Sequence, residues 1–330
     1  MAKTTFLKRL KVDPYILAIV LMVVLASVIP CRGLAAVVMN DVTYAAIALL
    51  FFLYGARLPV ETIIEGLTNW RLQVTVLVCT FLLFPILGLV FSHLFQSLLG
   101  PSLSMGLLFL CLLPSTVQSS IAFTSIARGN VAAALCSASI SNLLGIFVSP
   151  LLVTLLIAKH GTGISAASVK DIVLQLLVPF LAGQLLRPWL KGFVLKHKFL
   201  LSFVDRGSIL LVVYTAFSEG VVHGIWNQID LKSLLLLLLV NLLLLIVLLV
   251  LTTIASRRMG FSKEDEIAIV FCGSKKSLAS GIPIANVLFS AQTVGLMVLP
   301  LMLFHQVQLM ACAALARRYA RRQEITQPTK

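Results

Sequence analysis

The chain has 330 residues, of which 59% are hydrophobic and 12% are charged, and its mean hydropathy is +1.04. A soluble protein needs about a quarter of its residues charged to cover its surface, so this composition excludes a water-soluble globular protein and indicates an integral membrane protein. The formal charge of +14 does not indicate a nucleic-acid partner, because the basic residues lie in short connections between apolar segments.

Apolar runs that are long enough to cross a bilayer follow one another along the chain. A helix needs about 20 mainly apolar residues to cross the hydrocarbon core. Reading these runs between charges and turn residues predicts ten transmembrane helices, at 14–30, 42–57, 70–95, 103–127, 130–157, 171–187, 207–226, 232–256, 264–290 and 292–316. The expected fold is therefore all-α and integral to the membrane, with lipid as its main surroundings.

The basic residues predict how these helices are oriented. Every second connection, starting with the N-terminus, carries most of the Lys and Arg residues, whereas the opposite set carries only Arg32, Lys159, Lys170 and Lys232. Because basic residues favour the cytoplasmic side, both termini are predicted to be cytoplasmic. No convincing small-residue cleavage pattern follows the basic N-terminus, so residues 15–30 are read as the first span of an inner-membrane, that is plasma-membrane, multi-pass protein.

A short repeat divides the predicted helices into two halves. The seven residues from Gly145 to Leu151 resemble those from Gly295 to Leu301, at equivalent points of the fifth and tenth helices. An odd number of helices in each half places the second half upside down, which predicts two inverted five-helix repeats, residues 1–158 and 159–330. The alternative is a chance match between two proline-containing helices.

Polar, helix-breaking residues interrupt the fourth helix of each half. One run extends from Pro114 to Ser120, and the other from Cys272 to Pro283. Proline removes a backbone donor, and the freed carbonyls need partners that hydrocarbon does not offer. The sequence therefore predicts two discontinuous helices that cross in the membrane and offer helix termini, hydroxyls and an amide to a ligand.

Two adjacent lysines, Lys275 and Lys276, lie in the second of these runs. A lysine at a helix centre costs about 2.5–3.5 kcal/mol on insertion scales, so a pair of them indicates a function. The alternative is that both side chains extend to the cytoplasmic face of the membrane.

At these residues the sequence resembles the bile acid:sodium symporter family, over about residues 13–320. The resemblance is carried by the break at Pro114, by Ala127-Arg128-Gly129-Asn130 and by Pro150. Phe271-Cys272-Gly273-Ser274-Lys275-Lys276-Ser277-Leu278 followed by Gly281-Ile282-Pro283 is similar to the divergent branch that holds the seventh human member of solute carrier family 10 and bacterial relatives.

The resemblance implies a panel domain of helices one, two, six and seven, and a core domain of helices three to five and eight to ten. Substrate would bind between them. It also implies two sodium sites, but their key glutamate is replaced here by Val270, their glutamine by Ser274, and helix-five ligands by Ala134 and Ala138. Because sodium prefers oxygen ligands, neither site is expected to be intact. Sodium coupling stays an open alternative, and no metal or other cofactor is expected.

The expected function is secondary active transport of a small organic anion by alternating access. One lysine of the pair would replace a bound cation, its ammonium held by oxygens of Gln118, Ser119 and Ser120. Burial favours the neutral amine, so this lysine could also exchange a proton with the solvent. The ion- or substrate-binding set is Gln118, Ser119, Ser120, Ser274, Lys275, Lys276 and Ser277, with Glu219, His305 and Gln306 as weaker candidates.

Two other functions remain open at this stage. A membrane-embedded hydrolase would use Ser274 or Ser277 with a neutral lysine as a catalytic dyad. A regulator of ion homeostasis that transports nothing would explain why the sodium ligands are replaced. Transport is preferred because an enzyme leaves the internal repeat unexplained.

Overall fold

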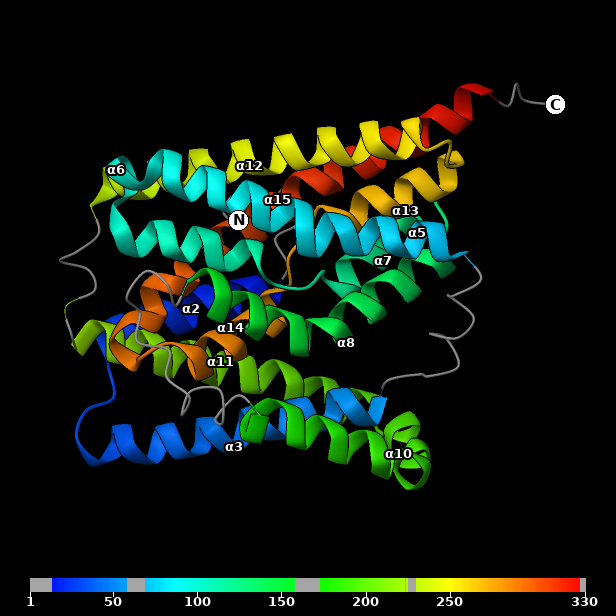
Figure 1. The fold of residues 1–330 in the computed structure, drawn as a ribbon. Coiled ribbons are helices and arrows are strands. Elements are labelled where there is room, and N and C mark those ends of the chain that lie inside the picture. The colour runs from blue at the N-terminus through cyan, green and yellow to red at the C-terminus, as the bar shows by residue number, and fades with distance from the viewer. Residues whose placement is uncertain (1–13, 58–68, 158–172, 223, 225–229, 327–330) are drawn as a thin grey trace, which may run out of the picture. The chain divides into compact units, whose positions relative to one another are not determined.

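The computed structural model describes residues 14–57, 69–157, 173–222, 224 and 230–326. Every regular element in these residues is a helix (Figure 1). The elements are α2 (Pro14–Val28), α3 (Leu34–Arg57), α5 (Trp70–Val78), the π-helical turn η2 (Cys79–Leu83), α6 (Phe84–Cys111), α7 (Val117–Ile126), α8 (Val131–Leu156), the π-helical turn η4 (Val173–Leu177), α10 (Val178–Lys196), α11 (Lys198–Val222), α12 (Leu231–Arg258), α13 (Lys263–Gly273), α14 (Leu278–Leu288) and α15 (Ala291–Thr326).

Seven helical stretches in the described residues are long and apolar enough to cross a membrane, and Leu17–Val28 is a shorter apolar helix. The protein is therefore a multi-pass membrane protein. The number of ten crossings and the inverted relation of the two halves stay predictions.

Several helices are longer than the sequence predicted. Helix α3 begins at Leu34 instead of 42, α10 continues to Lys196 instead of ending at 187, and α11 begins at Lys198 instead of 207. The predicted ends were placed at charged residues. Lysine and arginine are good helix formers, so a charge ends the apolar run without ending the helix.

The chain divides into two compact units. Unit 1 comprises Met1–Arg57, Val173–Gln228 and Ser290–Gly295, and unit 2 comprises Leu58–Ile172, Ile229–Phe289 and Leu296–Lys330. The assignment of panel and core domains as parts that move during transport stays a prediction.

In unit 1, glycines bring α3 and α10 into direct backbone contact. A Cβ atom on Gly55 would lie 2.0 Å from the carbonyl oxygen of Phe180, and one on Gly183 would lie 2.0 Å from that of Phe52. Small residues at helix contacts allow the close backbone approach that drives helix association in membranes. Buried hydroxyls join α3 to α11, where Thr43 and Thr215 are 2.9 Å apart.

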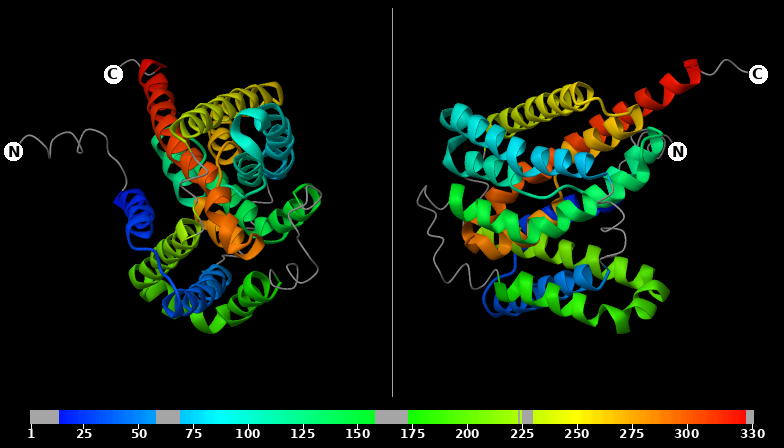
Figure 2. Two further views of the ribbon diagram at one scale, coloured as in Figure 1. Left: turned by 90° about the vertical axis from the view of Figure 1, so that its left-hand side faces the viewer. Right: turned by 45° about the vertical axis from the view of Figure 1, so that its right-hand side comes forward.

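Unit 2 is built around α13. One apolar cluster places Ala268 and Cys272 of α13 against α5 and α8, and a second places Ile267 and Phe271 against α15. Helices α12 and α15 run beside α13 (Figure 2). In the stretch Lys263–Leu288, 94% of the most apolar window is buried, against 28–56% in the other six stretches. The interrupted helix that carries both lysines is thus the most enclosed part of the described chain.

Candidate functional site

Both predicted interruptions are present in unit 2. Helix α6 ends at Cys111 and α7 begins at Val117, so residues 112–116 are not helical. Helix α13 ends at Gly273 and α14 begins at Leu278, so residues 274–277 are not helical. Below, these two segments are called break 1 and break 2.

Hydrogen bonds join the two breaks directly. The backbone N–H of Ser277 donates to the carbonyl of Pro114 at 2.9 Å. The hydroxyl of Thr116 donates to the carbonyl of Lys276 at 2.8 Å, and that of Ser115 donates to the carbonyl of Cys272 at 2.6 Å. Each bond gives a partner to a carbonyl that an uninterrupted helix would have paired internally, as a low-dielectric interior requires. The two breaks therefore form one connected structure.

The amine of Lys276 lies in an enclosed cage. Its Nζ donates to the carbonyl of Thr80 at 2.9 Å and to that of Leu113 at 2.5 Å, and it stands 4.0 Å from the centre of the Phe84 ring. Lys276 is 0% exposed. An aromatic face attracts a cation, so the ring complements the two oxygens. The alternative that Lys276 extends to the membrane surface does not fit this arrangement.

Local sequence explains why both oxygens are free. Leu113 lies in break 1, where no helical donor follows. In the π-helical turn, the N–H of Phe84 donates to the carbonyl of Cys79 instead of Thr80. The next residue is Pro85, which has no N–H, so the Thr80 carbonyl has no partner within its helix. The lysine amine takes the place of both missing donors.

The peptide of Lys276 is also held from α15. Gln308 accepts from the N–H of Lys276 and donates to its carbonyl, both at 3.0 Å, and Gln308 Nε2 lies 2.9 Å from Nδ1 of His305. An amide side chain has both a donor and an acceptor, so it can replace the peptide partner that a broken helix loses. His305 thus acts on the break through Gln308.

The amine of Lys275 has a different environment. Its Nζ donates to the hydroxyl of Ser119 at 3.2 Å and stands 4.6 Å and 5.7 Å from the ring centres of Phe123 and Phe271. Lys275 is also 0% exposed. Among the described residues, no carboxylate forms an ion pair with either lysine. Two buried amines without an acidic partner make this region a place for negative charge.

The other predicted ligands are arranged differently from the expectation. Of Gln118, Ser119 and Ser120, only Ser119 contacts a lysine amine. Gln118 is exposed, and the Ser120 hydroxyl donates to the carbonyl of Phe271 at 3.0 Å. The prediction that one ammonium gathers all three oxygens is therefore wrong, because backbone carbonyls freed at Thr80 and Leu113 hold the Lys276 amine instead.

Neither serine of break 2 contacts a lysine amine. The Ser274 hydroxyl donates to the carbonyl of Val270 at 2.6 Å, and that of Ser277 donates to Ser280 at 3.1 Å. The serine–lysine dyads that the sequence suggested with Ser274 or Ser277 are thus not assembled.

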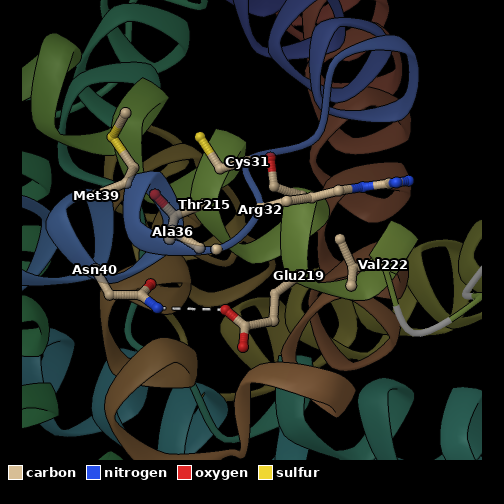
Figure 3. A pocket seen from close by; sticks show the side chains of 10 residues that line it. Cys31, Arg32, Ala36, Met39, Asn40, Thr215, Glu219 and Val222 are labelled. Carbon is tan, nitrogen blue, oxygen red and sulfur yellow. Dashed lines mark hydrogen bonds between the residues drawn. The ribbon is translucent and has the colours of Figure 1, made fainter.

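The weaker candidates belong to different units: Glu219 to unit 1, and His305 and Gln306 to unit 2. Gln306 is half-buried on α15. Glu219 belongs to unit 1, where it accepts from Asn40 at 3.4 Å and lines a cavity of about 340 Å³ with Arg32 and Cys31 (Figure 3). The carboxylate and the Asn40 amide point toward each other, whereas the Arg32 side chain extends away from them.

The helix-five positions where the resemblance implied sodium ligands contribute no side-chain oxygen. Ala134 and Ala138 belong to the apolar cluster around α13, and the Ala134 carbonyl accepts a weak bond from Cys272 Sγ at 3.6 Å. Among the described residues, no group of three or more His, Cys, Asp or Glu side chains is placed to hold a metal ion. The side chains that can bring positive charge to this region are the two lysines.

Comparisons with known proteins identify the family of this chain and several relatives. The chain matches the model of the SBF-like CPA transporter family over residues 13–321. It is 56% identical to an uncharacterized protein of Pseudomonas aeruginosa over 313 residues, covering 94% of each chain. It is 54% identical over 312 residues to YfeH of Escherichia coli, whose name marks it as a candidate symporter, again over 94% of each chain. The chain belongs to the SBF-like CPA transporter family. More distant members include the rat sodium/bile acid cotransporter 7, 27% identical over 313 residues, or 92% of this chain and 91% of that one.

The sequence did not predict several of the groups that surround Lys276. The carbonyls of Thr80 and Leu113 and the ring of Phe84 surround Lys276, and Gln308 holds its peptide. Pro85 was the one available signal, because it marks a free carbonyl one turn earlier. No pattern in the sequence indicates that a lysine 196 positions away takes that carbonyl.

Proposed function

We propose that this protein is a secondary active transporter that moves a small organic anion across the bacterial inner membrane by alternating access. Membership of a transporter family supports transport as such. The observation that carries the choice of an anion is the pair of fully buried amines, Lys275 and Lys276, with no carboxylate partner among the described residues. A buried positive charge favours a ligand of opposite sign.

A lysine ammonium replaces a bound cation in this proposal. Lys276 brings a positive charge to the carbonyl of Leu113 just beyond the C-terminal end of α6, where the helix dipole favours a cation, and to that of Thr80 in the π-helical turn. A tethered charge of this kind stabilises the crossed breaks without any ion from solution. Transport is then independent of sodium, and a proton taken up or released by a lysine is the remaining means of coupling.

Uptake by proteoliposomes tests this function. The purified chain would be reconstituted and supplied with an isotopically labelled extract of water-soluble metabolites, and the contents would be analysed by mass spectrometry. We expect one or more organic anions to accumulate under a pH gradient and not under a sodium gradient. The Lys276→Gln variant should lose this uptake, whereas Lys191→Gln, which removes an exposed lysine of α10, should retain it.

Two results would contradict the proposal. Sodium-driven uptake that Lys276→Gln leaves unchanged would show that transport is coupled to sodium and not to the lysine. Accumulation of no anion at all, by protein that retains its fold, would favour a regulatory role over transport.

A further inference from the structure

The two adjacent lysines differ in how completely their surroundings enclose them. Thr80, Phe84 and Leu113, which surround the Lys276 amine, are each 0% exposed. In contrast, two of the three residues that contact the Lys275 amine, Ser119 and Phe123, are only partly buried, and the third, Phe271, is 0% exposed. Ser119 and Phe123 lie four positions apart, so they share one face of α7. A solute that reaches that face of α7 reaches the surroundings of Lys275 and not those of Lys276.

The two amines also differ in their hydrogen bonding. Lys276 donates to two carbonyl oxygens that have no helical donor, whereas Lys275 donates to one hydroxyl at 3.2 Å. An ammonium carries three N–H donors, so Lys275 has donors to spare for a ligand. Removal of the Lys276 amine would leave the Thr80 and Leu113 carbonyls without a donor inside the protein. Lys276 is thus part of the structure, and Lys275 is available.

A second feature beside Lys275 favours an anion. Ser277 caps α14 by accepting from the N–H of Ser280, but α7 has no side-chain cap, and the hydroxyl of its N-cap residue Thr116 donates to the carbonyl of Lys276. The first N–H groups of a helix and its dipole attract negative charge. Ser119, which bonds the Lys275 amine, is the third residue of α7. The Lys275 amine therefore lies beside the uncapped N-terminal turn of α7.

We propose that Lys275 and the first turn of α7 bind the oxyanion of the transported solute, and that the internal amine of Lys276 holds the two breaks together. The ligand group is an oxyanion such as a carboxylate, sulfonate or phosphate. This assignment rests on the proposed transport function. It separates the two lysines by role: Lys275 binds the solute, and Lys276 maintains the shape of the site.

Charged thiol reagents test the binding role without knowledge of the solute. Lys275→Cys and Lys276→Cys would be compared in proteoliposomes, with sulfonatoethyl methanethiosulfonate as the anionic reagent and its trimethylammonium analogue as the cationic one. Each rate would be normalised to that of free cysteine, and peptide mass spectrometry would separate the new site from the six natural cysteines. We expect Cys at position 275 to react about tenfold faster than at 276, with a preference for the anionic reagent.

Unfolding in detergent tests the structural role independently. Lys275→Met and Lys276→Met each replace an amine by an apolar side chain of similar length. Lys276→Met should lower the Tm by more than Lys275→Met does, because only the former leaves two carbonyls without donors. The proposal is overturned if position 275 resists both reagents, if position 276 reacts faster, if the cationic reagent is preferred, or if the order of the two Tm values is reversed.

These measurements also separate this proposal from the proposed function. Reagent rates and Tm values are obtained whether or not any solute is transported. A protein that transports no anion but shows the expected rates contradicts the transport function alone. A protein that transports an anion while Lys275→Met retains uptake contradicts the assignment of Lys275 alone.

Discussion

The turn between α7 and α8 depends on one glycine. Arg128 adopts a left-handed φ of +55°, and Gly129 follows it with its Cα against α13. A Cβ atom on Gly129 would lie 2.5 Å from Cγ2 of Ile267. Asn130 then caps α8 and donates to Asp265 at 2.8 Å, which fixes the turn to the start of α13. The Ala-Arg-Gly-Asn motif is therefore a packing device between the two interrupted helices.

Replacement of this glycine should destabilise the protein. Gly129→Ala forces α13 away from the turn, and we expect a loss of about 1–3 kcal/mol in the free energy of unfolding, the usual cost of overpacking. Gly192→Ala is the matched control, since nothing lies within 4 Å of a Cβ at that position of α10. Unfolding in detergent measures both. Equal stability of the two variants would contradict the close contact with Ile267.

Individual residues of the site could be predicted from the sequence only as far as their chemistry is unusual. Two lysines and a proline in an apolar run stand out against their surroundings, so Lys275, Lys276 and Pro114 were found. Of the partners of the two amines, Ser119 was found, but the carbonyls of Thr80 and Leu113 were not, because backbone carbonyls carry no sequence signal. Gln118 was predicted as a ligand from its amide, and its place on the exposed side of α7 was not evident from the sequence. Its role in binding stays a prediction.

Helix α13 is fixed at its N-terminal end by a single carboxylate. Glu266 is 3% exposed and accepts from Lys263 at 2.6 Å, from Tyr319 at 2.9 Å and from Arg257 at 3.1 Å. These donors come from α12, α13 and α15. The ring of Tyr319 also packs edge-on against Phe271, which in turn faces the Lys275 amine. The anchor at Glu266 is thus connected to the lysine site along one helix.

Removal of one hydroxyl tests this anchor. Tyr319→Phe retains the ring on Phe271 and removes the hydroxyl that donates to Glu266, so we expect a loss of about 0.5–1.5 kcal/mol in stability. Hydrogen exchange at the amides of Ile267–Phe271 should become faster. Tyr44→Phe, at an exposed position of α3, is the control and should change neither quantity. Unchanged exchange in Tyr319→Phe would show that the two charged donors hold α13 without it.

For whole helices, the sequence predicts interruptions within a helix better than the residues at which a helix begins or ends. Both interruptions were found because proline, glycine and polar residues are costly at membrane depth. The predicted boundary between the helices 70–95 and 103–127 agrees with the backbone at Gly100, where α6 leaves the helical region at φ 77° and ψ 168° before it continues beyond Pro101. An apolar run gives no sign of whether a helix stops or bends there, because both choices satisfy the backbone.

The whole molecule raises the question of how often the chain crosses the membrane. The stretch Trp70–Cys111 has 42 residues and counts as one apolar helix. At 1.5 Å per residue it would extend about 63 Å, roughly twice the 30 Å hydrocarbon core. The left-handed Gly100 and the adjacent Pro101 divide it into two parts of spanning length once α7 is added to the second. Two crossings in opposite directions therefore fit this stretch better than one.

The described helices are compatible with ten crossings, the number that the sequence predicts. Beyond the seven long apolar stretches, α2 adds one crossing, the division at Gly100 adds a second, and η4 with α10 adds a third, since Val173–Lys196 is as long as α3. Seven is an odd number and ten is even. The two counts consequently differ in whether the termini lie on the same side of the membrane.

Reporter fusions decide between these counts. Alkaline phosphatase is active only outside the cytoplasm. Green fluorescent protein is fluorescent only if it stays inside the cytoplasm, because it does not become fluorescent after export by the general secretory route. We expect phosphatase fused after Gly100 to be active, and phosphatase fused at the C-terminus to be inactive where green fluorescent protein is bright. The basic residues near both ends favour the cytoplasm, and an even number of crossings requires both ends to lie on the same side of the membrane.

Active phosphatase at the C-terminus together with an N-terminal green fluorescent protein that is bright would mean an odd number of crossings. Two inverted halves of five helices would then be impossible, because their sum is even.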